Sequence, residues 1–202
     1  MFRAPFTPAK LIRGDLPTLL PPTVVAGGQV LIEALIDQSG RPVRTTILRT
    51  TPPYEQAVTA AVMRWQFEPA RAVQEDGTQA AIASKVLVAA IFKPPTFPDG
   101  PTLGEAPKDL GAPSPDVPYP TSIAVPPYPP LALAGSVVMF ELVIDERGSV
   151  TRLRPISSDP GFDSAAMDVV WSWKFRPATV NGKPVRSVAY VLFGFNQPVT
   201  IQ

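Results

Sequence analysis

Apolar residues recur at every second position in two segments of the chain, residues 30–36 and 138–144. This period of two is typical of a β-strand that turns one face toward a core. Each segment ends in Ile-Asp and leads into a turn that contains glycine, which favours a hairpin and a second strand over 42–50 or 149–157. The expected core positions are Val30, Ile32, Ala34 and Ile36 in the first segment and Val138, Phe140, Leu142 and Ile144 in the second.

A spacing of three and four residues replaces the alternation after each second strand. Apolar side chains at this spacing run through residues 54–65 and 162–173, which predicts an amphipathic helix of about three turns in each place. A side-chain acceptor followed by proline stands just before each stretch and suits a helix N-cap and first helical position. The predicted N-caps are Thr51 and Asp159.

Each predicted helix is followed by Trp-x-Phe-x-Pro-Ala, where proline is hostile to a continuing helix. Asp76-Gly77 and Asn181-Gly182 then predict turns, and apolar runs over 82–92 and 186–195 predict a last strand. The predicted unit is therefore strand, strand, helix, strand. It corresponds to a small three-stranded antiparallel sheet with one packed helix, in the α+β class.

The two units are copies of one pattern. Residues 20–70 and 128–178 align at a constant offset of 108 without a gap, and 17 of the 51 aligned positions are identical. A repeat of this length is the size of a small domain, so we predict two homologous domains in tandem. The predicted divisions are an N-terminal extension (1–19), a first domain (20–92), a Pro-rich linker (93–127) that acts as an extended spacer, and a second domain (128–202).

Amino-acid composition excludes several classes of binding site and catalytic chemistry. The chain of 202 residues has a net charge of +1 and lacks a basic cluster interleaved with aromatics, which argues against a nucleic-acid surface. Cysteine and histidine are absent, so thiol nucleophiles, imidazole bases and the commonest transition-metal ligands are missing as well. An enzyme would have to work with carboxylates alone. We therefore predict a protein without catalytic residues, metal, cofactor or small-molecule substrate.

Three pairs of residues recur at equivalent positions, and each pair has two possible roles. Trp65 and Trp173 lie on the apolar stripe of a helix, which favours a core role over ligand stacking. The aspartates at the glycine turns favour local hydrogen bonds over a pair of catalytic acids. Glu33 and Glu141 lie on the other face of the first strand, among apolar neighbours. That face is either solvated or a contact between domains, and the sequence leaves both interpretations open. The turn aspartates are Asp37 and Asp145.

The assembled motifs resemble the C-terminal domain of TonB, the energy transducer of Gram-negative bacteria. The similarity rests on the Ile-Asp strand end, the glycine turn, the Trp-x-Phe-x-Pro-Ala helix exit, the Asn-Gly turn and the closing apolar strand. The second copy also carries Tyr128-Pro129-x-x-Ala132, which matches the opening motif of that family, whereas the first copy has Leu20-Pro21-Pro22 there. The resemblance covers residues 20–92 and 128–196.

The resemblance implies a periplasmic protein-binding domain whose last strand has an open edge. Such an edge pairs with a short extended segment, the TonB box, near the N-terminus of outer-membrane transporters, so the implied partner is a transporter segment or another cell-envelope protein. No run of about 18 apolar residues is present, so an export signal or membrane anchor is expected upstream of the chain or removed from it. The candidate pairing-edge residues are Arg186, Ser187, Val188, Ala189, Tyr190, Val191, Leu192 and Phe193 in the second copy and Ile82, Ser84, Val86 and Val88 in the first.

A structural scaffold is the alternative. In that case the two domains pair through their own last strands or outer faces, within one chain or between two chains, and have no transport role. The two hypotheses make opposite claims about the same backbone groups. An open edge at residues 186–195 favours peptide binding, and a sheet that runs through both copies favours the scaffold.

Overall fold

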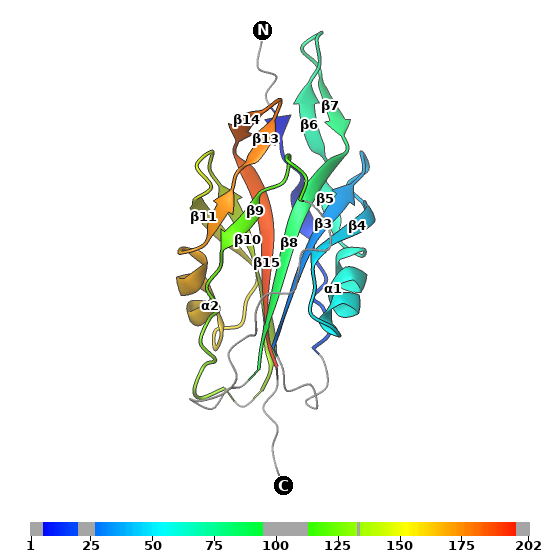
Figure 1. Ribbon diagram of the computed structural model, residues 1–202. Helices are drawn as coiled ribbons and strands as arrows, with labels where there is room; N and C mark the ends of the chain where they lie inside the picture. The colour runs from blue at the N-terminus through cyan, green and yellow to red at the C-terminus, as the bar shows by residue number, and fades with distance from the viewer. Residues whose placement is uncertain (1–5, 20–26, 95–112, 133, 197–202) are drawn as a thin grey trace.

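A single six-stranded sheet forms the centre of the molecule, with the strand order β11-β10-β15-β8-β3-β4 (Figure 1). The computed structural model describes residues 6–19, 27–94, 113–132 and 134–196. Three strands come from each half of the chain, so each half contributes one outer and two inner strands. They are β3 (Gly28–Ile36), β4 (Pro42–Arg49) and β8 (Ser84–Lys93) from the first half, and β10 (Ser136–Ile144), β11 (Val150–Ser157) and β15 (Ser187–Phe195) from the second.

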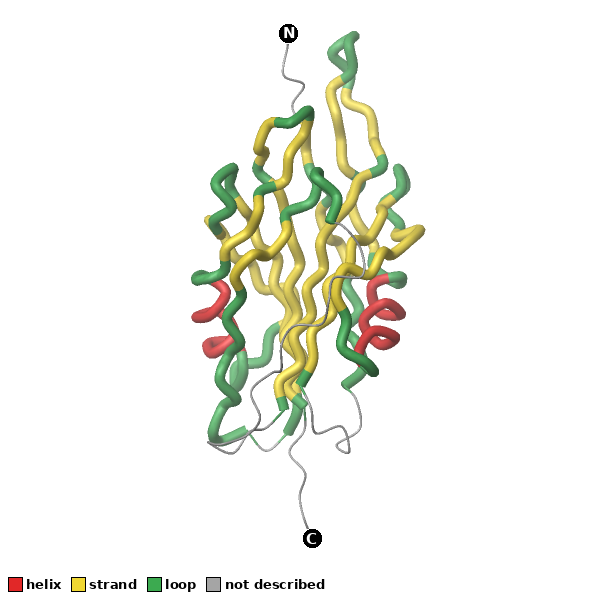
Figure 2. Tube along the Cα trace, in the orientation of Figure 1, coloured by secondary structure: helices red, strands yellow, loops and turns green. Residues whose placement is uncertain are grey.

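The two helices of the described residues, α1 (Tyr54–Val62) and α2 (Asp163–Val170), lie on opposite faces of this sheet. Figure 2 shows both at the periphery, with the strands between them. The parallel pairing of β8 with β15 explains the arrangement. Two similar halves that meet through parallel strands are related by a rotation about an axis along those strands, and this rotation carries the helix of one half to the other face.

Strand alternation is confirmed in both halves. The eight core positions predicted in β3 and β10 are all 0% exposed. Within each half the long strands form the expected three-stranded antiparallel sheet, in the orders β8-β3-β4 and β11-β10-β15, with one helix packed on it. The turns predicted at Asp76-Gly77 and Asn181-Gly182 connect the β6–β7 and β13–β14 hairpins, with φ of 81° at Gly77 and 73° at Gly182.

Several short strands were not predicted, because a strand of two to four residues is too short to show a period. They pair in four small sheets that are separate from the main sheet. They are β1 (Phe6–Thr7), β2 (Lys10–Arg13), β5 (Gln66–Glu68), β6 (Ala70–Val73), β7 (Gln79–Ile82), β9 (Tyr119–Ser122), β12 (Lys174–Arg176), β13 (Ala178–Val180) and β14 (Lys183–Val185).

The predicted helix caps are wrong. Pro53 and Phe162 precede α1 and α2, and neither helix has a side-chain cap hydrogen bond. Thr51 and Asp159 instead fasten the start of the neighbouring strand: Thr51 Oγ1 accepts a hydrogen bond from the amide of Gln29 (3.2 Å), and Asp159 Oδ2 accepts one from Ser136 Oγ (2.6 Å). Thr51 is thus used between elements, and Asp159 is used both between elements and locally, because its Oδ1 accepts a hydrogen bond from the amide of Gly161 ahead of α2 (3.1 Å).

The segment before each half is packed and not a spacer. Strand β2 pairs with β5, and β9 pairs with β12 at the corresponding place in the second half. Each segment also accepts a hydrogen bond from a buried indole: Trp65 Nε1 donates to Asp15 O (2.8 Å), and Trp173 Nε1 donates to Ala124 O (2.9 Å). The spacer prediction is therefore wrong for residues 113–127, because edge strands accept proline. Residues 95–112 of the predicted linker, and 20–26 with the Leu20-Pro21-Pro22 motif, lie outside the described residues.

Each face of the sheet carries a core cluster built from both halves. The cluster under α1 joins Trp65 and Phe67 to Met139, Tyr190 and Leu192 of the second half. The cluster under α2 likewise brings β3 and β8 residues of the first half together with the second half's Trp173. Both tryptophans are core residues as predicted, with 2% and 0% of their surface exposed. The contact interpretation of the second strand face is confirmed at Leu31 and Met139, each of which is buried in the other half's cluster, whereas Leu35 and Val143 of the same face are partly exposed.

Asp37 and Asp145 organise the turns that follow β3 and β10. Asp37 Oδ1 accepts hydrogen bonds from the amides of Ser39 (2.8 Å) and Arg41 (2.9 Å), and Asp145 Oδ1 accepts them from Arg147 (3.0 Å) and Ser149 (2.8 Å). The local role predicted for both is confirmed. These bonds, led by the amides of Arg41 and Ser149, hold the pKa of each carboxyl below its ordinary value of 3.8.

We expect these two turns to make stability sensitive to acid. A carboxyl whose pKa is lower in the folded state stabilises it above the unfolded value, and the gain is lost as the pH falls through the folded pKa. Urea midpoints measured from pH 6 to pH 2 should therefore separate the wild type from the Asp37→Asn/Asp145→Asn variant at pH 6. The difference should shrink below about pH 3.8. A difference that does not change with pH would contradict this role.

Candidate functional site

The predicted pairing edges are paired with each other. Strands β15 and β8 form a parallel ladder of seven residue pairs, from Ala189 opposite Leu87 to Phe195 opposite Lys93. On its other side β15 pairs with β10, and β8 pairs with β3. Both strands therefore have neighbours on both sides, and they run side by side at the centre of Figure 1.

The prediction of an open edge at these strands is wrong. The same backbone groups that would hold a peptide hold the other half of the chain, and this pairing also buries the apolar side chains of both strands. Two of the candidate residues lie outside the two strands: Ile82 ends β7, and Arg186 comes just before β15. The remaining candidates lie in the strands, Ser84, Val86 and Val88 in β8 and Ser187, Val188, Ala189, Tyr190, Val191, Leu192 and Phe193 in β15.

Close packing accompanies the backbone pairing at this junction. Gly194 of β15 lies against the ring of Phe92 in β8, and a Cβ on Gly194 would collide with that ring. The Phe92 ring is stacked on Tyr54, with centroids 4.2 Å apart. Tyr54 in turn accepts a hydrogen bond from Asn196 Nδ2 of the second half (2.8 Å). Glycine is needed here because the two halves approach so closely.

Tyr190 is the polar centre of the contact between the halves. Its hydroxyl accepts a hydrogen bond from the amide of Leu11 (2.9 Å) and donates one to Glu141 Oε2 (3.3 Å). Glu141 is also held by Arg154 through two hydrogen bonds, of 3.0 Å and 2.7 Å. Burial, followed by the charge of Glu141, raises the pKa of Tyr190, which keeps the hydroxyl protonated as the donor that Glu141 requires.

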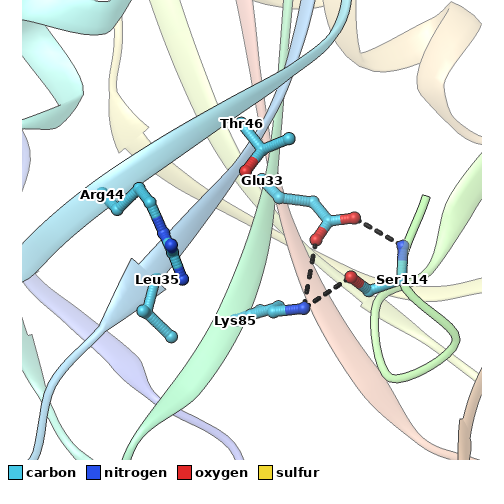
Figure 3. A pocket seen from close by; sticks show the side chains of 6 residues that line it. All are labelled: Glu33, Leu35, Arg44, Thr46, Lys85 and Ser114. Carbon is cyan, nitrogen blue, oxygen red and sulfur yellow. Dashed lines mark hydrogen bonds and ion pairs between the residues drawn. The ribbon is translucent and has the colours of Figure 1, made fainter. Parts of the chain in front are cut away.

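Glu33, the counterpart of Glu141 in the first half, lies in a small pocket of about 90 Å³ (Figure 3). Glu33 is 4% exposed, and its Oε2 lies 3.7 Å from Lys85 Nζ. Ser114 closes the arrangement, because its amide donates to Glu33 Oε1 (2.5 Å) and its hydroxyl accepts from Lys85 Nζ (2.5 Å). Lys85 therefore forms an ion pair with Glu33 and donates a hydrogen bond to Ser114, which holds the carboxylate and the serine side by side.

A larger groove of about 490 Å³ lies on the opposite face of the sheet, in the second half. Strands β10, β11 and β15 supply its floor, and the N-terminal segment supplies one wall. Sequence reasoning missed this groove because its residues come from four separate segments. Its lining residues are Phe6, Pro8, Val143, Thr151, Arg152, Arg186 and Val188.

Neither groove has the ligands of a metal site. Among the residues that the structure describes, no group of three or more histidine, cysteine, aspartate or glutamate side chains converges. In the same part of the chain, neither helix has the length and apolar content needed to cross a bilayer.

The second half consists of three long antiparallel strands, a helix between the second and third, and a Tyr-Pro motif ahead of the first. Residues 125–196 match the family of the Gram-negative bacterial TonB protein C-terminal domain. The match spans β10 through β15, so it supports a TonB C-terminal domain in this half of the chain. No curated protein matches the chain.

Proposed function

We propose that this chain is a TonB-like protein-interaction scaffold of the cell envelope, in which two homologous TonB C-terminal-type domains form an intramolecular dimer. The parallel pairing of β8 with β15 carries the proposal. It uses the edges that a TonB-like domain would offer to a transporter segment. In this proposal the chain recognises partners through its outer surfaces and not through its last strands.

Strand registers support a common origin of the two domains. Gly28 lies opposite Phe92 in the first half, and Ser136 lies opposite Phe195 in the second. Gly28 and Ser136 are 108 positions apart, the offset of the sequence repeat, and the two phenylalanines are 103 apart. The difference of five residues falls in the longer β6–β7 hairpin, which extends beyond the sheet in Figure 1.

The outer strands β4 and β11 are poor sites for adding a strand. Each has one neighbour in the described part of the main sheet, β3 or β10. Each also carries two irregularities in its register and a proline, Pro42 or Pro155, that pairs in the ladder. Bulges and prolines are the means by which natural sheets discourage pairing at an edge.

Amide exchange tests the scaffold directly. We expect the amides of residues 189–195 and 87–92 to exchange only through global unfolding, because these residues lie in the ladder between two inner strands and are buried. Peptides from the N-termini of outer-membrane transporters should leave the chemical shifts of these amides unchanged at millimolar concentration. Rapid exchange there, with shifts concentrated on residues 189–195, would restore strand addition as the function and overturn the scaffold.

A further inference from the structure

The two grooves occupy equivalent positions on opposite faces of the sheet. At the offset of 108, Leu35 and Arg44 in the first half correspond to Val143 and Arg152 in the second. The last strands β8 and β15 align at an offset of 103, so Lys85 corresponds to Val188. In each half the remaining wall comes from the segment that precedes the other half: Ser114 closes the first-half groove, and Phe6 and Pro8 close the second-half groove.

The first-half groove is filled by the chain's own carboxylate. Glu33 forms an ion pair with the ammonium of Lys85 and accepts a hydrogen bond from the N–H of Ser114. As Figure 3 shows, these three groups meet on one side of the pocket, which leaves only about 90 Å³. The groove therefore shows what this position accommodates: a carboxylate between a cationic side chain and a backbone amide.

The second-half groove has Val188 in place of Lys85, and its cations are two arginines at other positions, without a carboxylate beside them. Glu141 is turned to Arg154 and does not line the groove. Arg152 and Arg186 do line it, and neither has an ion-pair partner among the residues the structure describes. An open volume of about 490 Å³ beside two unpaired guanidinium groups is complementary to a negatively charged ligand.

We propose that this groove binds an acidic, extended segment of a partner protein. Carboxylates of the segment pair with Arg152 and Arg186, and its apolar side chains lie on Val143 and Val188, which face each other across β10 and β15. The exposed ring of Phe6, 38% accessible, covers the segment from the side. This inference rests on the proposed function and names the chemistry of the partner. A peptide is favoured over a bare phosphate because the floor between the arginines is apolar.

Peptide binding to the full chain tests the inference. The probe is a fluorescent octapeptide of alternating glutamate and valine, with a lysine-for-glutamate peptide as its control, followed by polarisation and by amide shifts. We expect shifts at residues 143, 151–152 and 186–188 with the acidic peptide only. The Arg152→Glu/Arg186→Glu variant should bind the peptide about a hundredfold more weakly, because it loses two charge-assisted contacts worth about tenfold each. The Arg152→Lys/Arg186→Lys variant keeps both positive charges and should retain most of the wild-type affinity.

Arg44→Glu is the matched control, because it reverses the equivalent arginine in the half whose groove is already filled. It should change affinity less than about twofold. The inference is overturned if the acidic peptide fails to bind, if the double reversal leaves affinity unchanged, or if anionic phosphatidylglycerol vesicles bind this surface and the peptide does not. Amide exchange of β8 and β15 separates the two proposals: if these amides stay protected in any such result, the docking surface fails and the scaffold stands.

Discussion

Replacement of Trp65 by alanine should lower the free energy of unfolding by about 3–5 kcal/mol, the range expected for truncation of a large buried aromatic side chain. Trp65 is 2% exposed and packs edge-on against Tyr190 of the second half, with ring centroids 5.6 Å apart. Its indole N–H also donates to Asp15 O (2.8 Å), and that carbonyl would lose its partner. The cavity would therefore open between the two halves and at the N-terminal segment together.

The shared cores also determine how many steps the unfolding transition should have. Because each cluster contains residues of both halves, the Trp65→Ala variant should unfold in one step, like the wild type. Urea titrations followed by far-ultraviolet circular dichroism and by tryptophan fluorescence should give coincident curves. Two separated transitions, with the second half unaffected, would mean that the halves fold independently and would contradict the shared core.

Trp171 provides the control for this substitution. It lies just after α2 with 50% of its surface exposed. Trp171→Ala therefore removes an indole whose burial contributes little to the free energy of unfolding. Its effect should stay within about 0.5 kcal/mol. Similar losses for both variants would show that the Trp65 result does not report the inter-half core.

The long strands and the helices were predictable because their periods are local properties of the chain. Apolar residues at every second position over seven residues, and at spacings of three and four in the helices, depend on which side chains meet the nearest core. Both halves follow the same rule. The helix caps failed because Thr51 and Asp159 bond to the strands beside them. A sequence does not indicate which of several nearby amides an acceptor will take.

The pairing of β8 with β15 was not fixed by the sequence, because an inner strand and a peptide-binding edge strand carry the same apolar pattern. One signal did point to it: Leu31 and Met139 lie on the strand face away from their own helix, where a solvated face would be polar. These side chains are 1% and 0% exposed, each buried in the other half's cluster. The grooves could not be predicted from the sequence for a different reason. Their walls include Ser114 or Phe6 and Pro8, and the position of these segments depends on the tertiary fold.

Gly40→Ala should be among the most damaging single substitutions in the chain, because two independent costs fall on one residue. Gly40 has φ of 82°, a region that costs an L-residue about 1–2 kcal/mol. A Cβ there would also collide with the carbonyl oxygen of Phe67. The amide of Phe67 donates to Gly40 O (2.8 Å), so the turn cannot move away from β5 without breaking that bond. We expect a total loss of about 3 kcal/mol or more.

Gly77 separates the two costs, because its φ of 81° is nearly the same and nothing lies within 4 Å of the position that its Cβ would take. Gly77→Ala should therefore lower the free energy of unfolding by the conformational cost alone, about 1–2 kcal/mol. The difference between the two variants, measured by urea unfolding, isolates the contact between the turn and β5. Because Gly148 has φ of 79° and meets the carbonyl of Phe175 in the same way, Gly148→Ala should reproduce the larger loss in the second half. Equal losses at Gly40 and Gly77 would mean that the turn yields to the added methyl group, and the contact with β5 would then add nothing to stability.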